Sequence, residues 1–128
     1  MERVGLDTGF FIKVFEGEEE AVRVWSSVVE GELKAVTSSL VLFELKRLFH
    51  RLGKIERWDE VSEAILLNCE VVPVDVDVAQ EGASVSHGTG LPAIDALIYV
   101  SVKPADRFYT TDKSFEVVKK KKPKVVIL

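Results

Sequence analysis

The stretch RVGLDTGFF, residues 3–11, joins a short apolar segment to an acidic residue and then to the beginning of a helix. Residues 3–7 predict a strand that ends on Asp7, and the apolar residues from Thr8 to Phe15 predict a helix. A strand that leads directly into a helix is the repeating unit of α/β folds. We therefore expect the rest of the chain to repeat this unit.

The alternation of strands with helices continues to the end of the chain. Further strands are predicted at residues 34–38, 70–75, 107–111 and 124–128. Further helices are predicted at residues 18–30, 39–52, 54–68, 76–87, 92–103 and 112–120. Pro73 places the third strand near an edge of the sheet, because proline cannot donate a ladder hydrogen bond. The predicted fold is a three-layer α/β/α arrangement around a mainly parallel sheet of about five strands, formed by one domain over residues 1–128.

The composition is that of an ordinary globular protein, with 47% hydrophobic and 30% charged residues. No apolar run approaches the roughly 18 residues that a membrane span requires, and the first residues do not have the layout of a signal peptide. Cys69 is the only cysteine, so no internal disulfide can form. We interpret Cys69 as a core residue and expect a reducing, cytoplasmic location with no membrane partner.

Four acidic residues occupy equivalent places in this pattern. Asp7 follows the first strand and Asp112 follows the fourth, while Glu44 and Asp95 lie near the beginnings of two helices. The carboxyl ends of parallel strands meet at one edge of the sheet, which is where α/β proteins bind ligands. We therefore expect all four carboxylates to converge at that edge.

Each acid also has a simpler interpretation. Asp7 and Asp112 could cap helices, Glu44 could pair with Arg47 one turn later, and Asp95 could favour a helix amino terminus. For Asp95 the neighbouring apolar residues predict burial, and a buried carboxylate is costly unless something pairs with it. Its own helix face carries Leu91, Ile98 and Val102.

Together the four acids are better explained by a bound cation. Clustered carboxylates repel one another and would take up protons, and helix capping alone does not explain why they would cluster. Hard cations such as Mg²⁺ and Mn²⁺ prefer oxygen ligands and complete their shell with water or phosphate. We predict such an ion, held by Asp7, Glu44, Asp95 and Asp112.

Four segments resemble, in order, the acid motifs of PIN domains, the nuclease fold of VapC-type toxins and related RNA-processing enzymes. These segments are GLDTGFF, SSLVLFELKR, GLPAIDALIYV and FYTTDKSF. The resemblance runs nearly end to end and implies Mg²⁺- or Mn²⁺-dependent hydrolysis of phosphodiester bonds, usually in RNA. It assigns the four acids to the catalytic and metal-binding set. It also gives Thr110 as the hydroxyl that supports the last acid, and Thr8 as the polar residue beside the first.

Two positions depart from the family pattern. Gly9 stands where many relatives have Ser or Asn, and Ser114 stands where many have a further acid. With one carboxylate fewer, we expect one tightly bound metal ion and a second that is recruited only with substrate.

The net charge of −4 argues weakly against binding nucleic acid without sequence preference. Without the four site acids, however, 17 acidic residues balance 17 basic ones, so repulsion of RNA is a weak objection. Lys13, Lys46 and Lys113 follow acid motifs closely and are predicted to contact substrate phosphates.

The leading hypothesis is thus a divalent-metal-dependent endoribonuclease, the toxin of a toxin–antitoxin pair. The resemblance implies a homodimer and an antitoxin partner, and we expect the first four helices to form either interface. The alternative is a PIN-like binding or assembly module with weak or no catalysis, which Gly9 and Ser114 motivate. Phosphoryl transfer is a weaker alternative. A haloacid-dehalogenase-like sheet would need an acid at position 9, where this chain has glycine. A receiver-like sheet would need a phosphoacceptor aspartate at the end of a middle strand and a lysine further along, and Asp75 and Lys103 match this pattern poorly.

Overall fold

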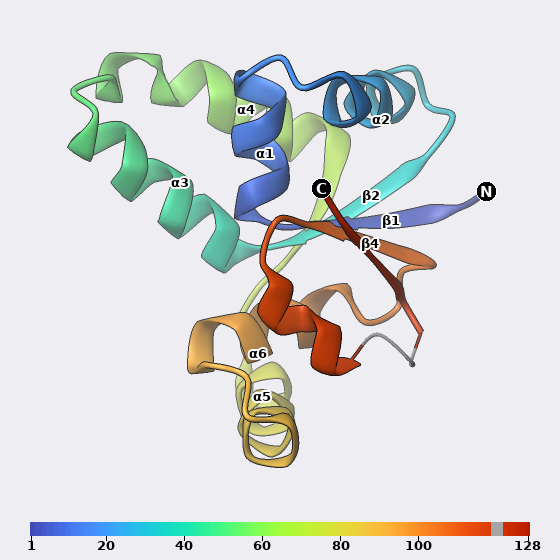
Figure 1. The fold of residues 1–128 in the computed structure, drawn as a ribbon. Coiled ribbons are helices and arrows are strands. Elements are labelled where there is room, and N and C mark those ends of the chain that lie inside the picture. The colour runs from blue at the N-terminus through green and yellow to red at the C-terminus, as the bar shows by residue number, and fades with distance from the viewer. Residues whose placement is uncertain (119–121) are drawn as a thin grey trace.

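The computed structural model describes residues 1–118 and 122–128, and over these residues it contains a five-stranded sheet with helices on both faces (Figure 1). The strands are β1 (Arg3–Leu6), β2 (Lys34–Ser38), β3 (Cys69–Val72), β4 (Arg107–Thr110) and β5 (Lys124–Ile127). The α-helices are α1 (Thr8–Phe15), α2 (Glu19–Val29), α3 (Ser39–Arg51), α4 (Trp58–Asn68), α5 (Val76–Thr89) and α6 (Ala93–Val102). Two short 3₁₀ helices are η1 (Ile55–Arg57) and η2 (Lys113–Val118).

The sheet has the strand order β3-β2-β1-β4-β5, and every neighbouring pair is parallel. Gly5 of β1 lies opposite Val36 of β2 on one side and Phe108 of β4 on the other. From β1 the chain builds the sheet outward through β2 and β3, and then returns to add β4 and β5 on the other side. Between β1 and β4 the order reverses, and such a switch point leaves a crevice at the carboxyl ends of the strands.

Helices α1 to α4 cover one face of the sheet, and α5, α6 and η2 cover the other, so the predicted three-layer α/β fold is confirmed (Figure 1). The central strands are buried on both faces, as is typical of parallel sheets between helical layers. Leu6 of β1 and Phe108 of β4 are completely buried. In the described part of the chain, no helix is both long and apolar enough to cross a membrane.

Gly5 allows α6 to pack directly against the central strand. A Cβ atom at this position would lie 2.7 Å from Cβ of Val102, at the end of α6. Helices of parallel sheets run antiparallel to the strands, so the beginning of α6 points toward the carboxyl edge of the sheet. This packing therefore carries Asp95, in the first turn of α6, to the switch point.

Two predicted elements differ from the observed ones. The third strand ends at Val72 rather than at residue 75, because Pro73 cannot continue the hydrogen-bond ladder. The edge location of that strand is confirmed by the strand order. The helix predicted over 112–120 is the 3₁₀ helix η2 over Lys113–Val118, and the remainder of the predicted segment lies outside the described residues.

Candidate metal centre

Asp7 is the most deeply buried acid of the site, with 6% of its surface exposed. It caps α1, since its Oδ1 atom accepts a hydrogen bond of 3.0 Å from the amide of Phe10. Its Oδ2 atom accepts a hydrogen bond from the hydroxyl of Thr110 at the end of β4. Asp7 is thus fixed by both strands that flank the switch point, and capping is only part of its role.

The other three acids lie at the same edge, and hydrogen bonds hold Glu44 and Asp112 there. Glu44, in α3, accepts a hydrogen bond of 2.6 Å from the hydroxyl of Thr8. The Oδ1 atom of Asp112 accepts hydrogen bonds from the amide and the hydroxyl of Ser114, at 2.9 Å and 2.5 Å. Asp95 lies near Asp112 and Ser114, whose side chains affect its pKa.

The acids of the site affect one another's ionisation. Burial raises the pKa of Asp7 from 3.8 to about 7, and the charges of Asp112 and Glu44 add to this effect against the hydrogen bonds from Thr110 and Phe10. Burial and the charge of Asp112, with a smaller effect of Glu44, raise the pKa of Asp95 to about 6. Repulsion among like charges therefore reaches across all four chain segments.

Asp112 behaves in the opposite way. Burial opposes its ionisation, but the hydrogen bonds from Ser114 and Asp95 outweigh burial and lower its pKa. The interaction between the two acids thus raises the pKa of Asp95 and lowers that of Asp112. The site thus combines Asp112, which ionises readily, with Asp7 and Asp95, whose ionisation a bound cation would favour.

No such cation is supplied by the described residues. The ion pairs observed over residues 1–118 and 122–128 lie elsewhere: Lys13–Glu16, Lys103–Glu81, Arg107–Glu2 and Lys122–Asp106. Arg47, which could have paired with Glu44, lies instead with its guanidinium 5.6 Å from the ring centre of Phe43. The acids are thus clustered, partly buried and not neutralised by the described basic side chains.

The donor chemistry of the site fits a divalent cation such as Mg²⁺ or Mn²⁺. Its ligand atoms are carboxylate and hydroxyl oxygens, the ligands that hard cations prefer. Within the described ranges, however, no three Asp, Glu, His or Cys side chains are already spaced to hold a metal ion.

The structure changes one detail of the sequence prediction and adds two others. Asp95 was expected to be buried but is only half-buried, because the first turn of α6 opens onto the sheet edge; Asp7 is the buried acid. The hydroxyl of Thr110 donates to the first acid, Asp7, and also accepts a hydrogen bond of 3.0 Å from the amide of the last acid, Asp112. The hydroxyl of Thr8, predicted only as the polar residue beside Asp7, donates to Glu44.

Sequence reasoning treated Ser114 only as a missing acid, whereas the structure shows it as a donor to Asp112. The signal was present, since a residue two positions after an aspartate commonly donates its amide to that side chain in a local turn. The Ser114 hydroxyl adds a second donor to the same oxygen of Asp112.

The three lysines predicted to contact substrate lie on exposed or half-exposed positions. Lys13 is tied to Glu16 on its own helix at 3.7 Å. Lys46 and Lys113 are exposed and take part in none of the ion pairs of the described residues. Lys113 directly follows Asp112, and Lys46 lies two residues after Glu44 on α3.

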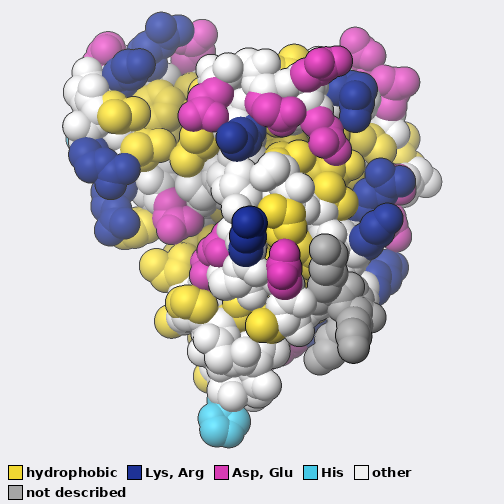
Figure 2. Space-filling view, in the orientation of Figure 1, with side chains coloured by type: hydrophobic (Ala, Val, Ile, Leu, Met, Phe, Trp, Pro, Cys, Tyr) yellow, Lys and Arg dark blue, Asp and Glu magenta, His cyan; other side chains and the backbone are white. Residues whose placement is uncertain are grey.

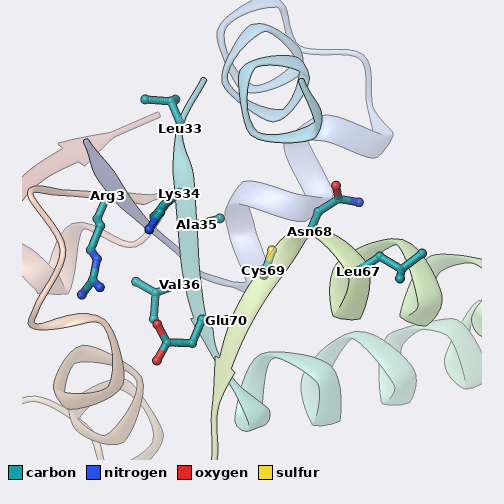
Figure 3. Close-up of a pocket in the computed structure, with 9 residues that line it drawn as sticks. All are labelled: Arg3, Leu33, Lys34, Ala35, Val36, Leu67, Asn68, Cys69 and Glu70. Carbon is teal, nitrogen blue, oxygen red and sulfur yellow. The ribbon is translucent and has the colours of Figure 1, made fainter. Parts of the chain in front are cut away.

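A cavity of about 310 Å³ lies away from the acids, at the amino ends of β1, β2 and β3. Figure 3 shows Arg3, Lys34 and Glu70 on one side of β2, and Leu67 and Asn68 on the other. Cys69 also lines it, but burial raises the pKa of this thiol to about 12, so it stays protonated and is a poor nucleophile. This cavity has no part in the acidic site.

An apolar groove crosses the helical face formed by α1, α3 and α4. Two adjoining hollows of about 480 and 180 Å³ form it, and both are lined by Phe15, Arg57 and Val61. Phe15 and Leu52 keep 47% and 56% of their surface exposed. Figure 2 shows hydrophobic atoms gathered on this part of the surface, between acidic side chains at the top and basic side chains at the left edge.

The chain is similar in sequence and in fold to known proteins. The PIN domain family model matches residues 4–121. The DNA-bound VapBC structure from Salmonella typhimurium has a TM-score of 0.76, with 17% identity over 99% of this chain and 98% of the other. VapBC2 from Rickettsia felis, bound to a promoter DNA fragment, has a TM-score of 0.74, with 14% identity over 98% of both chains.

A toxin–antitoxin complex from Klebsiella pneumoniae has a TM-score of 0.69, with 18% identity over 96% of this chain and 95% of the other. The search of curated proteins gives no match. At such low identities the structural likenesses show a shared fold, and the shared fold includes nearly the whole of each chain.

Proposed function

The chain belongs to the PIN domain family, and on this premise we propose that it is an endoribonuclease that hydrolyses RNA with Mg²⁺ or Mn²⁺. One observation carries the proposal: four carboxylates from separate segments are coupled at the switch point of the sheet, and none takes part in the ion pairs of the described residues. Such a site attracts a divalent cation, and a bound divalent cation can catalyse phosphodiester hydrolysis.

Within this proposal Asp7, Asp95 and Asp112 hold the metal ion, directly or through water. The ion lowers the pKa of bound water and shields the phosphate charge. Glu44 either ligates the ion or orients the attacking water, and Thr8 fixes the carboxylate of Glu44 for this task. Thr110 and Ser114 hold Asp7 and Asp112 in place. Because Ser114 is not an acid, we propose one tight metal site and a weaker second site that fills with substrate.

Asp95→Asn tests the proposal. The variant should cleave RNA on the order of 1000-fold more slowly in Mg²⁺ or Mn²⁺, because it removes a ligand charge worth several kcal/mol of transition-state stabilisation. Its melting temperature in EDTA should stay the same or rise, since one source of repulsion is gone. Asp77→Asn, an exposed acid in the first turn of α5, is the matched control and should cleave normally. Unchanged cleavage by Asp95→Asn would refute the assignment.

An inactive binding module remains the alternative, and the absence of three preset ligands among the described residues is the observation that favours it. Calorimetric titration with Mn²⁺ separates the two functions. The nuclease should bind at least one Mn²⁺ ion tightly, with proton release from Asp7 and Asp95 at neutral pH. A module without catalysis should show no tight site.

The basic side chains of α3 support RNA as the substrate. Lys46, Arg47 and Arg51 are exposed on this helix beyond Glu44, and none takes part in the ion pairs of the described residues. Figure 2 shows basic side chains along the left edge, where Figure 1 places α3. We propose that the phosphates of RNA follow α3 into the site, with Lys13, Lys46 and Lys113 as the nearest contacts. Opposite charge draws RNA to such a surface.

We also propose an antitoxin-like protein partner for the apolar groove, because the similar structures include toxin–antitoxin complexes. Leu52→Glu should weaken binding of the co-expressed product of the neighbouring gene by roughly 100-fold, because it buries a charge in an apolar contact. Cleavage by the variant alone should be unchanged. Leu67→Glu, which is 76% exposed and lies outside the groove, serves as the control. Equal binding by both variants would remove the groove from the interface. The homodimer and the cytoplasmic location stay predictions.

A further inference from the structure

Gly9 and Thr111 occupy the same space beside the acidic site. A Cβ atom at Gly9, the second residue of α1, would lie 2.0 Å from Oγ1 of Thr111 and 3.0 Å from its Cβ. The backbone of Gly9 does not require glycine, because its φ angle is not in the left-handed region. Glycine also disfavours a helix relative to alanine. The space taken by Thr111 is therefore the physical reason why position 9 has no side chain.

Thr111 is held between two residues of the acid network. On one side, the hydroxyl of Thr110 donates to Asp7. On the other, the amide of Asp112 donates to Oγ1 of Thr110 at 3.0 Å. With its neighbours fixed in this way, the side chain of Thr111 is directed onto the first turn of α1, two residues after Asp7.

The hydroxyl of Thr111 is left for an external partner. None of the side-chain hydrogen bonds seen in the described part of the chain involves it. Thr111 is half-buried, and no buried side-chain oxygen or nitrogen of the described residues lacks a partner, so this hydroxyl reaches solvent. A threonine hydroxyl can both donate and accept a hydrogen bond.

We propose that Thr111 is a positioning residue, whose hydroxyl binds an oxygen ligand of the divalent ion, from water or from phosphate. Gly9 is glycine in order to admit it. A serine at position 9, in the first turn of α1, could supply such a hydroxyl. In this chain Thr111, which follows β4, supplies it instead. This inference rests on the proposed metal-dependent nuclease function.

Thr111→Val tests the role of the hydroxyl, because valine keeps the shape of threonine. The variant should lose roughly tenfold in kcat/KM for RNA, the effect of one hydrogen bond in a polar site. Its melting temperature in EDTA should be unchanged, and Thr111→Ser should restore cleavage. If the ligand is water, affinity for Mn²⁺ without RNA should fall as well; if it is phosphate, only cleavage should fall. Normal Mn²⁺ affinity and normal cleavage by Thr111→Val would overturn the proposal.

The shared space is tested by unfolding in EDTA, which does not depend on activity. Gly9→Ala should lower the melting temperature by about 5 °C, since its methyl group is forced into Thr111. The loss should largely vanish in a Thr111→Ala background. Gly88→Ala, in α5 with open space around it, is the matched control. Equal stability of Gly9→Ala and the parent chain would show that the two residues do not compete for space.

The combination of Gly9→Ser with Thr111→Ala moves the hydroxyl from one side of the contact to the other. It should recover the Mn²⁺ affinity or cleavage that Thr111→Ala loses, and failure to recover either would count against the positioning role. A parent chain that binds no Mn²⁺ and cleaves no RNA would end both the proposed function and this role. The unfolding experiments in EDTA would still test the packing of Gly9 against Thr111.

Discussion

Replacing Asp7 by asparagine is expected to abolish RNA cleavage and, at the same time, to make the chain harder to unfold in EDTA at pH 8. Cleavage should fall on the order of 1000-fold or more, because the variant removes a charged ligand of the metal ion. The gain in stability follows from burial. The pKa of Asp7 is raised from 3.8 to about 7, so ionising it in the folded chain costs about 4 kcal/mol.

Asparagine has the shape of aspartate without its charge. Its side-chain oxygen can still accept the amide of Phe10, which preserves the cap of α1. Its side-chain NH₂ group faces the hydroxyl of Thr110, which already accepts a hydrogen bond from the backbone amide of Asp112. Part of the gain in stability is therefore lost. We expect a net rise in melting temperature on the order of 5 °C at pH 8.

Thermal unfolding of both chains in EDTA at pH 8 and pH 4 provides the measurement. At pH 4 Asp7 is protonated in the folded chain, so the advantage of asparagine should disappear. Asp75→Asn is the matched control, because Asp75 caps α5 in the same way but is exposed. It should change neither cleavage nor stability appreciably. A lower melting temperature for Asp7→Asn at pH 8 would mean that Asp7 is needed for folding rather than for metal binding.

The convergence of the acids could be predicted because it depends on rules that are local in sequence. Asp7 and Asp112 each follow an apolar strand, and Glu44 and Asp95 each lie near a helix start. Once the strands are parallel, these positions all fall at one edge of the sheet. Only the strand order was missing, and it places the strands preceding Asp7, Glu44 and Asp112 side by side as β1, β2 and β4.

The hydrogen bonds within the site could not be predicted in the same way. Thr8 donates to Glu44, 36 residues away, and Thr110 donates to Asp7, 103 residues away. These pairings depend on how α1 and α3 pack over the ends of the strands, which no local pattern encodes. The same holds for burial: Asp95 has the more apolar sequence neighbours, yet Asp7 is buried because it stands between two central strands.

Gly9 shows most clearly what the sequence alone cannot predict. In the sequence, Gly9 is a departure from a family pattern, and it favours the hypothesis of an inactive module. In the folded chain it lies against Thr111, a residue 102 positions away, and the departure becomes one half of a contact. A glycine can thus be explained only when the residue that fills its space is known.

The stability of the unmodified chain should fall in EDTA as the pH rises from about 4 to about 7, and a divalent cation should reverse this fall. Asp7 has a pKa of 3.8 in an ordinary environment and about 7 in the folded chain. Between these values the folded chain keeps a proton that the unfolded chain has released. The stabilisation due to this proton is complete below pH 4 and is lost as the pH rises to about 7. Asp95, with a pKa of about 6, acts in the same direction but less strongly, since it is half-buried.

A divalent cation changes this balance because it binds the ionised acids of the folded chain. At pH 8, Mn²⁺ at 100 times its dissociation constant should restore about 2.7 kcal/mol, whereas at pH 5 the protons of Asp7 and Asp95 compete with it and its effect should be small. Melting curves from pH 4 to pH 8, with EDTA or with Mn²⁺, measure both effects. Asp7→Asn should flatten the curve in EDTA and remove most of the response to Mn²⁺. An equal response to Mn²⁺ at pH 5 and pH 8 would mean that the ion binds elsewhere, because only ligands that must lose protons make metal binding depend on pH over this range.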